Sequence, residues 1–337
     1  MHLVRFSRFG TPADVAELID APEPTPPLAG EALVDVVAAP INPADLLRLE
    51  GRYGNTTAAL PAFGGGEGVG RVAATGPGVE GIRAGDLVLL NRHFVNTGIW
   101  RERLTAPAEA LEPLPEADPL QLAMLSINPA TAWLMLARFV ALRPGDWVMQ
   151  NAANSATGHW LIKLAATLGV NTINVVRRED AAAELRAFGA RHVLVDGPDL
   201  AERVGRIAGA NRPCLAVDAV GGEATQRLAA AVAEGGVVVN YGLLSGEACR
   251  VASHDTVFRD VSLRGFWLHG WLTRASREER GDLYQTLARL VANGDLSVPV
   301  EATYPLARVR EALEHAARPG RTGKILLTGR LFERPPV

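Results

Sequence analysis

The sequence predicts an α/β fold, with a doubly wound parallel sheet and a second, mainly β domain. Two observations predict the parallel sheet. First, the apolar run 147–150 leads through a turn of small residues into a helix-like segment at 160–169, and then into the β-branched run 172–176. Second, short apolar runs alternate with helix-like segments from there to about residue 272. Such alternation is typical of a parallel sheet that is covered by helices on both faces.

Six runs are predicted to form the strands of this Rossmann-type sheet. Each run is short and rich in apolar or β-branched residues. The runs are residues 147–150, 172–178, 192–196, 214–218, 236–240 and 262–268. In an open parallel sheet, ligands bind outside the carboxyl ends of the strands, so the binding residues are expected there.

The turn after the first strand has the features of a phosphate-binding turn. The start of the following helix presents backbone N–H groups without partners in the helix, and small side chains would let a pyrophosphate approach them. The candidate cofactor-binding residues are Asn154, Ser155, Ala156, Thr157 and Gly158. Of the fingerprint G-x-G-x-x-G only the last glycine, Gly158, is present. An ordinary crossover without a ligand therefore remains the alternative.

The second strand ends in two arginines, Arg177 and Arg178. An NAD-binding chain usually carries an acidic residue there, which hydrogen-bonds the ribose 2′-hydroxyl. Two guanidinium groups can instead pair with a 2′-phosphate. The sequence therefore predicts that the cofactor is NADPH.

Composition narrows the class of protein. The chain has 337 residues, more than one core usually organises, so two domains are expected. With 48% hydrophobic residues and a net charge of −3, no large basic surface for nucleic acid is expected. No apolar run approaches the roughly 18 residues of a membrane span. The two cysteines, Cys214 and Cys249, suit neither a disulfide framework nor a zinc site, which indicates a reducing, cytoplasmic compartment.

The regions on either side of this alternating pattern have a different residue pattern. Residues 31–37 alternate like a strand, and residues 64–85 are glycine-rich with short β-like pieces. Near the end, apolar residues at helical spacing continue to residue 293, and a strand-like run follows at 324–328 that is expected to return to the first domain. The predicted domains are residues 1–124 with 273–337, and residues 125–272.

Motifs spread along the chain resemble one superfamily. The matching segments are residues 41–45, 51–54, 65–70, 128–133, 150–155, 174–177, 241–242 and 263–268. With them the sequence resembles the medium-chain dehydrogenases and reductases, in particular the NADPH-dependent 2-enoyl thioester reductases of the mitochondrial fatty-acid synthesis type, followed by the quinone oxidoreductases. The resemblance implies a GroES-like catalytic domain that is split around a Rossmann domain.

The sequence departs from the superfamily at two places. In the zinc alcohol dehydrogenases a histidine ligand precedes the glutamate of the glycine-rich strand, whereas Gly66 precedes Glu67 here. Without that histidine and without a cysteine cluster, we expect no metal site and no polarisation of the substrate by zinc. The loop 91–97 is less like that of the reductases and, with Trp100 just after it, is expected to border the substrate.

Tyr53 is the predicted catalytic residue and also a predicted substrate contact. Hydride adds to the carbon β to a carbonyl when an enolate can form, and the protein must then supply a donor to the oxygen and a proton for the α-carbon. A phenol, with an ordinary pKa of about 10, can do either. Tyr53 lies in a turn between Gly51 and Gly54, where the resembled reductases place their active-site tyrosine. The alternative is a turn aromatic that packs on Pro61 or Phe63.

Three further residues are candidate cofactor contacts, each with a structural alternative. Asn42 is expected to cap a short helix and could also contact the cofactor. Thr131 resembles a nicotinamide-contacting position of the family, or is a hydroxyl at a helix start. Tyr241 follows the fifth strand and could lie against the nicotinamide half of the cofactor, or pack at the strand end.

The last candidates lie near or beyond the sixth strand. Trp267 is expected to line the groove for cofactor or substrate, and a buried tryptophan is the alternative. Phe266 and Lys324 are also expected to contact the cofactor. Members that resemble this chain are commonly homodimers joined by edge strands of their Rossmann sheets, so residues 266–268 are expected in such a contact.

These observations predict an NADPH-dependent reductase of an activated carbon–carbon double bond. The favoured substrate is a trans-2-enoyl thioester on coenzyme A or acyl carrier protein, with hydride transfer to the β-carbon. One alternative is an NADPH quinone or enone oxidoreductase. Another is an NADPH-binding protein with a structural or regulatory role and no activity. A zinc alcohol dehydrogenase is opposed by Gly66.

Overall fold

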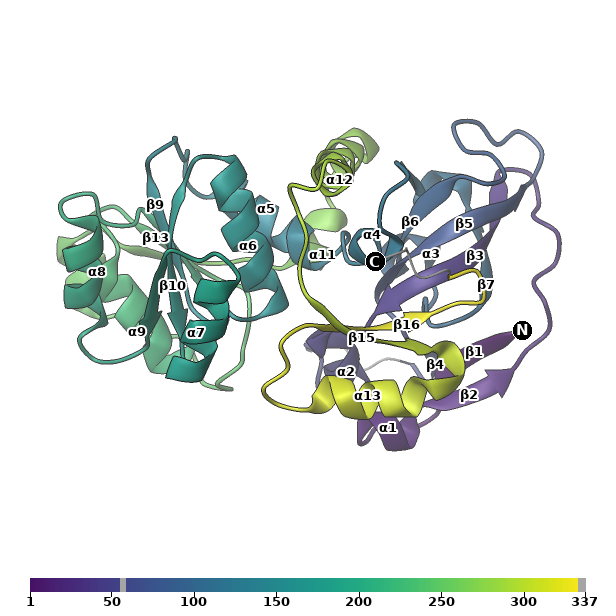
Figure 1. Cartoon of the computed structure of the whole chain (residues 1–337), viewed down its shortest axis with the longest axis horizontal. Coiled ribbons are helices and arrows are strands. Elements are labelled where there is room, and N and C mark those ends of the chain that lie inside the picture. The colour runs from purple at the N-terminus through teal and green to yellow at the C-terminus, as the bar shows by residue number, and fades with distance from the viewer. Residues whose placement is uncertain (55–58, 333–337) are drawn as a thin grey trace. The chain divides into compact units, whose positions relative to one another are not determined.

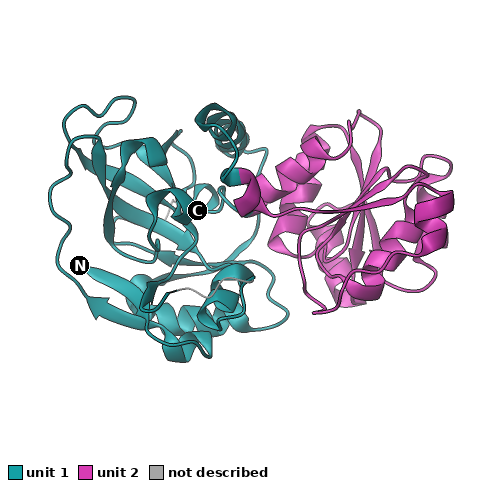
Figure 2. Ribbon diagram, turned by 180° about the vertical axis from the view of Figure 1, so that it is seen from behind, with its two compact units in different colours: residues 1–127, 272–337 teal, residues 128–271 magenta. Residues whose placement is uncertain are grey.

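The computed structural model describes residues 1–54 and 59–332. The chain divides into two compact units, and each is described here by itself. Unit 1 is residues 1–127 with 272–337, and unit 2 is residues 128–271 (Figure 2). The boundaries predicted from the sequence fall after residues 124 and 272.

Unit 2 contains a six-stranded sheet in which every neighbouring pair of strands is parallel (Figure 1). Its strands are β9 (Trp147–Gln150), β10 (Asn171–Val176), β11 (His192–Val195), β12 (Leu215–Asp218), β13 (Val237–Asn240) and β14 (Ser262–Gly265). Their order in the sheet is β11-β10-β9-β12-β13-β14. The order reverses between β9 and β12, and such a switch point is where open parallel sheets bind ligands. The predicted doubly wound sheet is confirmed.

Helices precede, connect and follow these strands. They are α5 (Asn128–Arg138), α6 (Ala156–Thr167), α7 (Glu179–Ala187), α8 (Leu200–Ala208), α9 (Gly222–Ala231) and α10 (Ser253–Phe258), while α11 (Leu268–Leu272) ends at the boundary of the units. The β-branched and small residues of the strands form the core: Ile173, Ala216 and Val238 are fully buried. This burial on the sheet explains the near-continuous apolar runs that predicted the strands.

Unit 1 is mainly β, as expected. The larger sheet has the order β15-β16-β3-β5-β6-β8, with β7 paired to β3, and a smaller sheet has the order β2-β1-β4. The strands are β1 (His2–Phe6), β2 (Glu17–Asp20), β3 (Glu31–Pro40), β4 (Ala62–Phe63), β5 (Glu67–Thr75), β6 (Leu87–Asn91), β7 (Arg103–Pro107), β8 (Glu112–Leu114), β15 (Val300–Pro305) and β16 (Lys324–Thr328). Because β16 pairs antiparallel with β3, the prediction that the final strand returns to the first domain is confirmed.

The helices of unit 1 are mostly short. They are α1 (Pro12–Val15), α2 (Pro43–Leu49), α3 (Arg92–Val95), α4 (Pro119–Leu122), α12 (Arg277–Ala292) and α13 (Val309–Ala317), with 3₁₀ turns at Ala108–Ala110 and Leu306–Arg308. The long helix α12 begins with a capping box between Ser276 and Glu279 and ends at Asn293, where its apolar periodicity stops.

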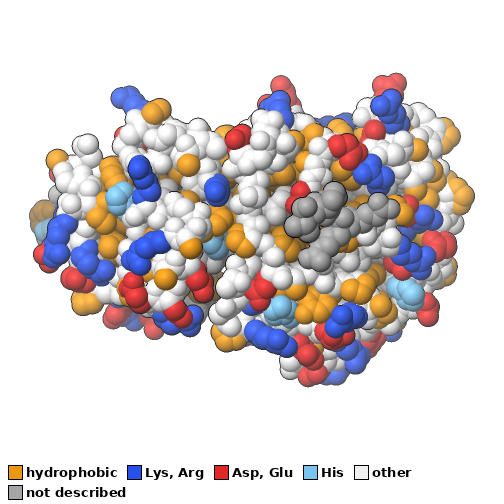
Figure 3. Space-filling model, viewed as in Figure 1, with side chains coloured by type: hydrophobic (Ala, Val, Ile, Leu, Met, Phe, Trp, Pro, Cys, Tyr) orange, Lys and Arg blue, Asp and Glu red, His pale blue; other side chains and the backbone are white. Residues whose placement is uncertain are grey.

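The surface and the helix lengths agree with the composition. On the face in Figure 3, basic and acidic side chains are interspersed. None of the helices in the described part of the chain is both long enough and apolar enough to span a bilayer.

Candidate active site

The predicted phosphate-binding turn joins β9 to α6, next to the switch point of the sheet. Ser155 is the N-cap of α6, and its Oγ accepts a hydrogen bond from the backbone N–H of Gly158 at 3.1 Å. A Cβ on Gly158 would lie 2.3 Å from the carbonyl oxygen of Ala153. The protein's own turn therefore requires this glycine, in addition to any ligand, and the cradle at the helix start fits the diphosphate of a dinucleotide.

Two more predicted residues, Thr131 and Tyr241, lie beside this turn. Thr157 donates through its hydroxyl to Oδ1 of Asn128, the first residue of α5, at 2.9 Å, and Thr131 is buried one turn further along that helix. Burial raises the pKa of Tyr241 to about 12, although hydrogen bonds with Ser155 and Thr157 act in the opposite direction. The structure thus brings Tyr241 to the phosphate turn.

Arg177 and Arg178 follow β10, and both side chains are exposed. Arg178 is the N-cap residue of α7, and its Nε lies 3.1 Å from Oδ1 of Asp180. Arg177 makes no ion pair or hydrogen bond within residues 1–54 and 59–332. The two guanidinium groups fit a 2′-phosphate at the end of the second strand. Arg178 already pairs with Asp180, whereas Arg177 has no such pair in the described residues.

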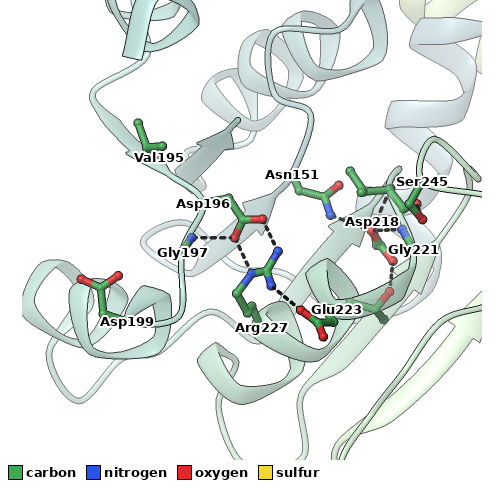
Figure 4. Close-up of polar contacts among 12 residues, drawn as sticks. Asn151, Val195, Asp196, Gly197, Asp199, Asp218, Gly221, Glu223, Arg227 and Ser245 are labelled. Carbon is green, nitrogen blue, oxygen red and sulfur yellow. Dashed lines mark hydrogen bonds and ion pairs between the residues drawn. The ribbon is translucent and has the colours of Figure 1, made fainter. Parts of the chain in front are cut away.

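The structure also shows a polar network at the carboxyl ends of β11 and β12, which the sequence analysis did not single out (Figure 4). Buried Asp218 accepts hydrogen bonds from Asn151 and Thr225, both at 2.6 Å, and from the N–H of Gly221 at 3.1 Å. Burial would raise the pKa of Asp218, but these bonds hold it below the usual value. The sequence feature that could have identified Asp218 is an aspartate directly after an apolar strand.

A second, separate pair lies at the end of β11 (Figure 4). Asp196, after β11, receives two hydrogen bonds from Arg227 of α9, at 2.7 and 2.5 Å. Because Asp196 and Asp218 both use their carboxylates inside the unit, their role is to shape the loops at the strand ends.

Phe266 and Trp267 follow β14. The N–H of Phe266 donates to the carbonyl of Asn240 at 2.8 Å, and its ring meets Phe139 edge-on at 6.0 Å. Trp267 is 56% exposed and its ring lies 4.7 Å from that of His269. The alternative of a buried tryptophan is therefore wrong, and Trp267 is accessible to a ligand.

In unit 1, Asn42 lies at the centre of a buried polar cluster. Its amide nitrogen donates to Oε1 of Glu67 at 2.8 Å, and its amide oxygen accepts from Nζ of Lys324 at 2.5 Å. The other carboxylate oxygen of Glu67 accepts from Oγ of Ser126 at 3.0 Å and from the N–H of Ile127 at 2.8 Å. Two predicted cofactor contacts, Lys324 and Asn42, thus lie against each other.

The charges of this cluster are almost completely removed from water. Glu67 is 0% exposed and Lys324 is 5% exposed. Burial therefore raises the pKa of Glu67 and lowers the pKa of Lys324. Asp45 accepts from the N–H of Asn42 at 2.8 Å, and burial raises its pKa to about 6. The cluster fixes the start of α2, and Asn42 is its N-cap residue as expected.

Tyr53 follows the other end of α2. It is half-buried and lies between Gly51 (φ 73°) and Gly54 (φ 61°), whose left-handed backbone lets the chain turn away from the helix. Residues 55–58, which come next, lie outside the described part of the chain. Two predicted residues, Asn42 and Tyr53, are thus held at the two ends of one short helix.

The structure corrects the prediction for Trp100. Its side chain is 1% exposed and lies against the backbone of Gly64 and Gly65, where an added Cβ would be 2.3 Å and 2.6 Å from the indole ring. Trp100 is therefore a core residue, and substrate contact would require the core to open. The sequence could not separate these cases because the two glycines that make room for the indole are distant in the chain. The loop 91–97 forms the single-turn helix α3 and its flanks.

The position before Glu67 leaves little room for a side chain. A Cβ on Gly66 would lie 3.2 Å from Oδ1 of Asp45 and 3.2 Å from Cδ1 of Ile127. In the part of the chain that the structure describes, no three His, Cys, Asp or Glu side chains gather in a way that could hold a metal ion.

Known proteins share this architecture. Residues 28–116 match the family model of the alcohol dehydrogenase GroES-like domain, and residues 156–292 match that of the zinc-binding dehydrogenases. The human mitochondrial enoyl-[acyl-carrier-protein] reductase is 37% identical over 334 residues, which cover 96% of this chain and 87% of that protein.

Two solved structures share the fold over nearly the whole chain. The mitochondrial 2-enoyl thioester reductase heterodimer of Candida tropicalis has a TM-score of 0.83 at 26% identity, and the match covers 97% of this chain and 99% of that chain. The quinone oxidoreductase of Escherichia coli, solved with NADPH, has a TM-score of 0.83 at 26% identity, with 97% and 100% covered.

A Rossmann sheet inserted into a GroES-like domain defines the class of medium-chain dehydrogenases and reductases. This chain belongs to that superfamily and, within it, to the family that contains the mitochondrial enoyl-[acyl-carrier-protein] reductases.

Proposed function

We propose that the protein reduces trans-2-enoyl thioesters, carried on coenzyme A or on acyl carrier protein, with NADPH as the reductant. The observation that carries the proposal is the 37% identity, over nearly the whole chain, to a relative named for this activity. The tyrosine at the end of α2 supports it, because an enoyl thioester needs a donor at its oxygen and a proton at its α-carbon.

Residues of unit 2 would hold the two phosphate-bearing parts of NADPH. The turn 154–158 presents the N-terminus of α6 to the diphosphate, with Tyr241 beside it. Arg177 and Arg178 are the counter-charges for the 2′-phosphate. We assign further cofactor contacts to Thr131, Phe266 and Trp267 of this unit, and to Asn42 and Lys324 of unit 1. When bound, NADPH supplies the hydride.

Residues of unit 1 would handle the oxygen and the proton of the substrate. The phenol of Tyr53 can donate a hydrogen bond to the thioester oxygen or a proton to the α-carbon. The buried cluster of Asn42, Glu67 and Lys324 holds the helix from which Tyr53 extends, so the phenol is positioned from a rigid support. Trp267 is a second candidate for substrate contact because its ring is exposed.

The test follows NADPH oxidation with crotonyl-CoA and with longer trans-2-enoyl-CoA, beside 1,4-benzoquinone, for wild type and Tyr53→Phe. We expect turnover of the enoyl-CoA substrates to fall about 100-fold or more in the variant, since general acid catalysis contributes that much. Equal thioester turnover by both proteins would remove Tyr53 from the mechanism.

Quinone or enone reduction is the second candidate, supported by the likeness to the quinone oxidoreductase of Escherichia coli. It uses the same NADPH site and needs no room for a pantetheine arm. Turnover of benzoquinone alone, unaffected by Tyr53→Phe, would favour it. Tight NADPH binding without turnover of any acceptor would instead indicate a non-catalytic role.

We further propose a homodimer that uses residues 266–268, and a cytoplasmic location. β14 is an edge strand of its sheet and its residues are exposed, which suits pairing with a second copy. Light scattering after gel filtration tests the dimer. Cell fractionation tests the compartment, and the relatives named above as mitochondrial make the mitochondrion the competing result.

A further inference from the structure

Two arginines of unit 1 contact Phe63, and a third lies near one of them. The Arg92 guanidinium donates to the carbonyl oxygen of Phe63, and the Arg101 guanidinium lies over the ring of Phe63, 5.0 Å from its centroid. Arg48, in the last turn of α2, is close enough to Arg92 for repulsion between the two charges to lower the pKa of Arg92. All three residues are half-buried.

Few negative groups of the protein compensate these charges. Over residues 1–54 and 59–332, no carboxylate forms an ion pair with any of the three. Arg101 is held by the carbonyl of Gly98 at 2.7 Å and the hydroxyl of Thr97 at 2.6 Å. Nε of Arg48 is buried and has no hydrogen-bond partner in those ranges.

One carboxylate lies near the cluster, and it is already engaged. Asp45 acts on both Arg48 and Arg92 through its charge, but its carboxylate accepts the N–H of Asn42. Burial, more than repulsion, lowers the pKa of Arg92 to about 10, and burial lowers the pKa of Arg101 to about 10. Half-buried guanidinium groups that are bound only by neutral oxygens keep part of their desolvation cost, and an anion with several oxygens would relieve that cost.

We propose that Arg48, Arg92 and Arg101 form a receptor for a phosphate group of the substrate's carrier arm. The inference rests on the proposed function, because enoyl thioesters of coenzyme A and of acyl carrier protein both carry a phosphopantetheine phosphate. Coenzyme A also carries nucleotide phosphates, which are a second source of the same chemistry. A quinone has no such group, so the receptor would separate the two candidate functions.

The cluster is tied to the segments that carry the candidate active site. Arg48 and Tyr53 belong to α2 and the turn after it. The N–H of Arg92 donates to the carbonyl of Gly66 at 3.0 Å, directly before the buried Glu67. An anion held there would therefore anchor the carrier arm within the same unit as the catalytic phenol.

The test compares three substrates with the same reacting group: crotonyl-pantetheine, crotonyl-4′-phosphopantetheine and crotonyl-CoA. For Arg92→Gln we expect KM to rise about tenfold for the two phosphate-bearing substrates, with kcat within about twofold, and KM for crotonyl-pantetheine to stay unchanged. A rise for crotonyl-CoA alone would assign the receptor to the nucleotide phosphates. An equal change for all three substrates, or no change, would overturn the proposal.

Controls separate the receptor from general damage. Arg308→Gln removes an exposed arginine that pairs with Glu311 in the same unit, and all three KM values should remain those of the wild type. Arg92→Lys keeps the charge and should restore part of the affinity. If circular dichroism shows that Arg92→Gln does not fold, Arg48→Gln takes its place with the same expected pattern.

A binding measurement keeps this inference distinct from the proposed function. Protein saturated with NADP⁺ is titrated calorimetrically with coenzyme A and with pantetheine. We expect the wild type to bind coenzyme A about tenfold more tightly than pantetheine, and Arg92→Gln to lose that difference. If the wild type reduces no enoyl thioester but shows this preference, the proposed function fails and the receptor stands. If the wild type binds both equally, the receptor fails.

Discussion

The candidate sites of the two units are built in opposite ways. In unit 2 the predicted phosphate turn is one continuous stretch, 154–158, and its helix start is closed by the local hydrogen bond between Ser155 and Gly158. In unit 1 the cluster around Glu67 joins residues from distant parts of the chain, and Lys324 is 282 positions from Asn42. A ligand cradle can therefore be formed by local backbone geometry, whereas a buried polar cluster exists only once the tertiary fold has formed.

The energetic consequences also differ. The turn in unit 2 depends on one absent side chain, since a Cβ at Gly158 has no room. The cluster in unit 1 depends on complete pairing, because each buried charge must find its partners or remain without water. Damage to the turn should be moderate and local, and damage to the cluster should be severe.

The largest expected effect is that of Glu67→Ala. Removing the carboxylate takes away the larger counter-charge of Lys324 and leaves Ile127 and Ser126 without their acceptor, which should lower the free energy of unfolding by about 3–5 kcal/mol. Equilibrium urea unfolding measures it. Glu67→Gln, which keeps the shape, should cost less.

The matched control for Glu67 is Glu116→Ala. That carboxylate pairs with Arg71 on the surface and is 73% exposed, so its removal should change stability little. If Glu67→Ala and Glu116→Ala proved equally mild, the cluster would not be the support of α2, and the contrast between the units would disappear.

Gly158→Ala should have an intermediate effect. The new methyl group would meet the backbone of Ala153, so the turn must shift, at a cost of about 1–3 kcal/mol together with weaker NADPH binding. Urea unfolding and fluorescence titration with NADPH measure the two effects. Gly265→Ala is the control, because no atom lies within 4 Å of the added Cβ. If Gly158→Ala changed neither the stability nor the NADPH affinity, the turn would be able to shift without cost.

The smallest expected effect is on cofactor choice. Changing Arg177 and Arg178 to alanine should raise the Kd for NADPH about tenfold through loss of a charge-assisted contact, while leaving the Kd for NADH unchanged. Stability should stay near that of the wild type because both side chains are exposed. Titration with the two cofactors checks it, and equal losses for both would remove the 2′-phosphate assignment.

Much of the fold could be predicted because its signals are local. The six parallel strands appeared as apolar runs separated by helical periodicity, and α12 ended where its apolar spacing stopped. Ser155 and Gly158 were found because a strand, a turn and a helix start adjoin in sequence. Asp218 was passed over because a strand-end aspartate gains its meaning only from Asn151 and Thr225.

Trp100 shows the limit most clearly. Its place next to an unusual loop suggested a substrate contact, but the glycines at 64 and 65 accept its indole into the core. Burial depends on which distant segments leave room, and that information is not carried by the residues near Trp100. The three arginines of the proposed receptor were missed for the same reason, since they come from α2, α3 and the segment before β7.

Neighbouring residues alone specify the strand and helix pattern, the parallel sheet, the turn of small residues before α6 and the two arginines after β10, because periodicity, turn composition and strand ends are local properties. Contacts between distant segments make Trp100 a core residue, leave Trp267 exposed, bring Tyr241 to the turn before α6, and gather Asn42, Glu67 and Lys324 in one buried cluster. Exclusion from water and the pairing of charges are set by contacts between segments far apart in the chain, and no local pattern specifies them.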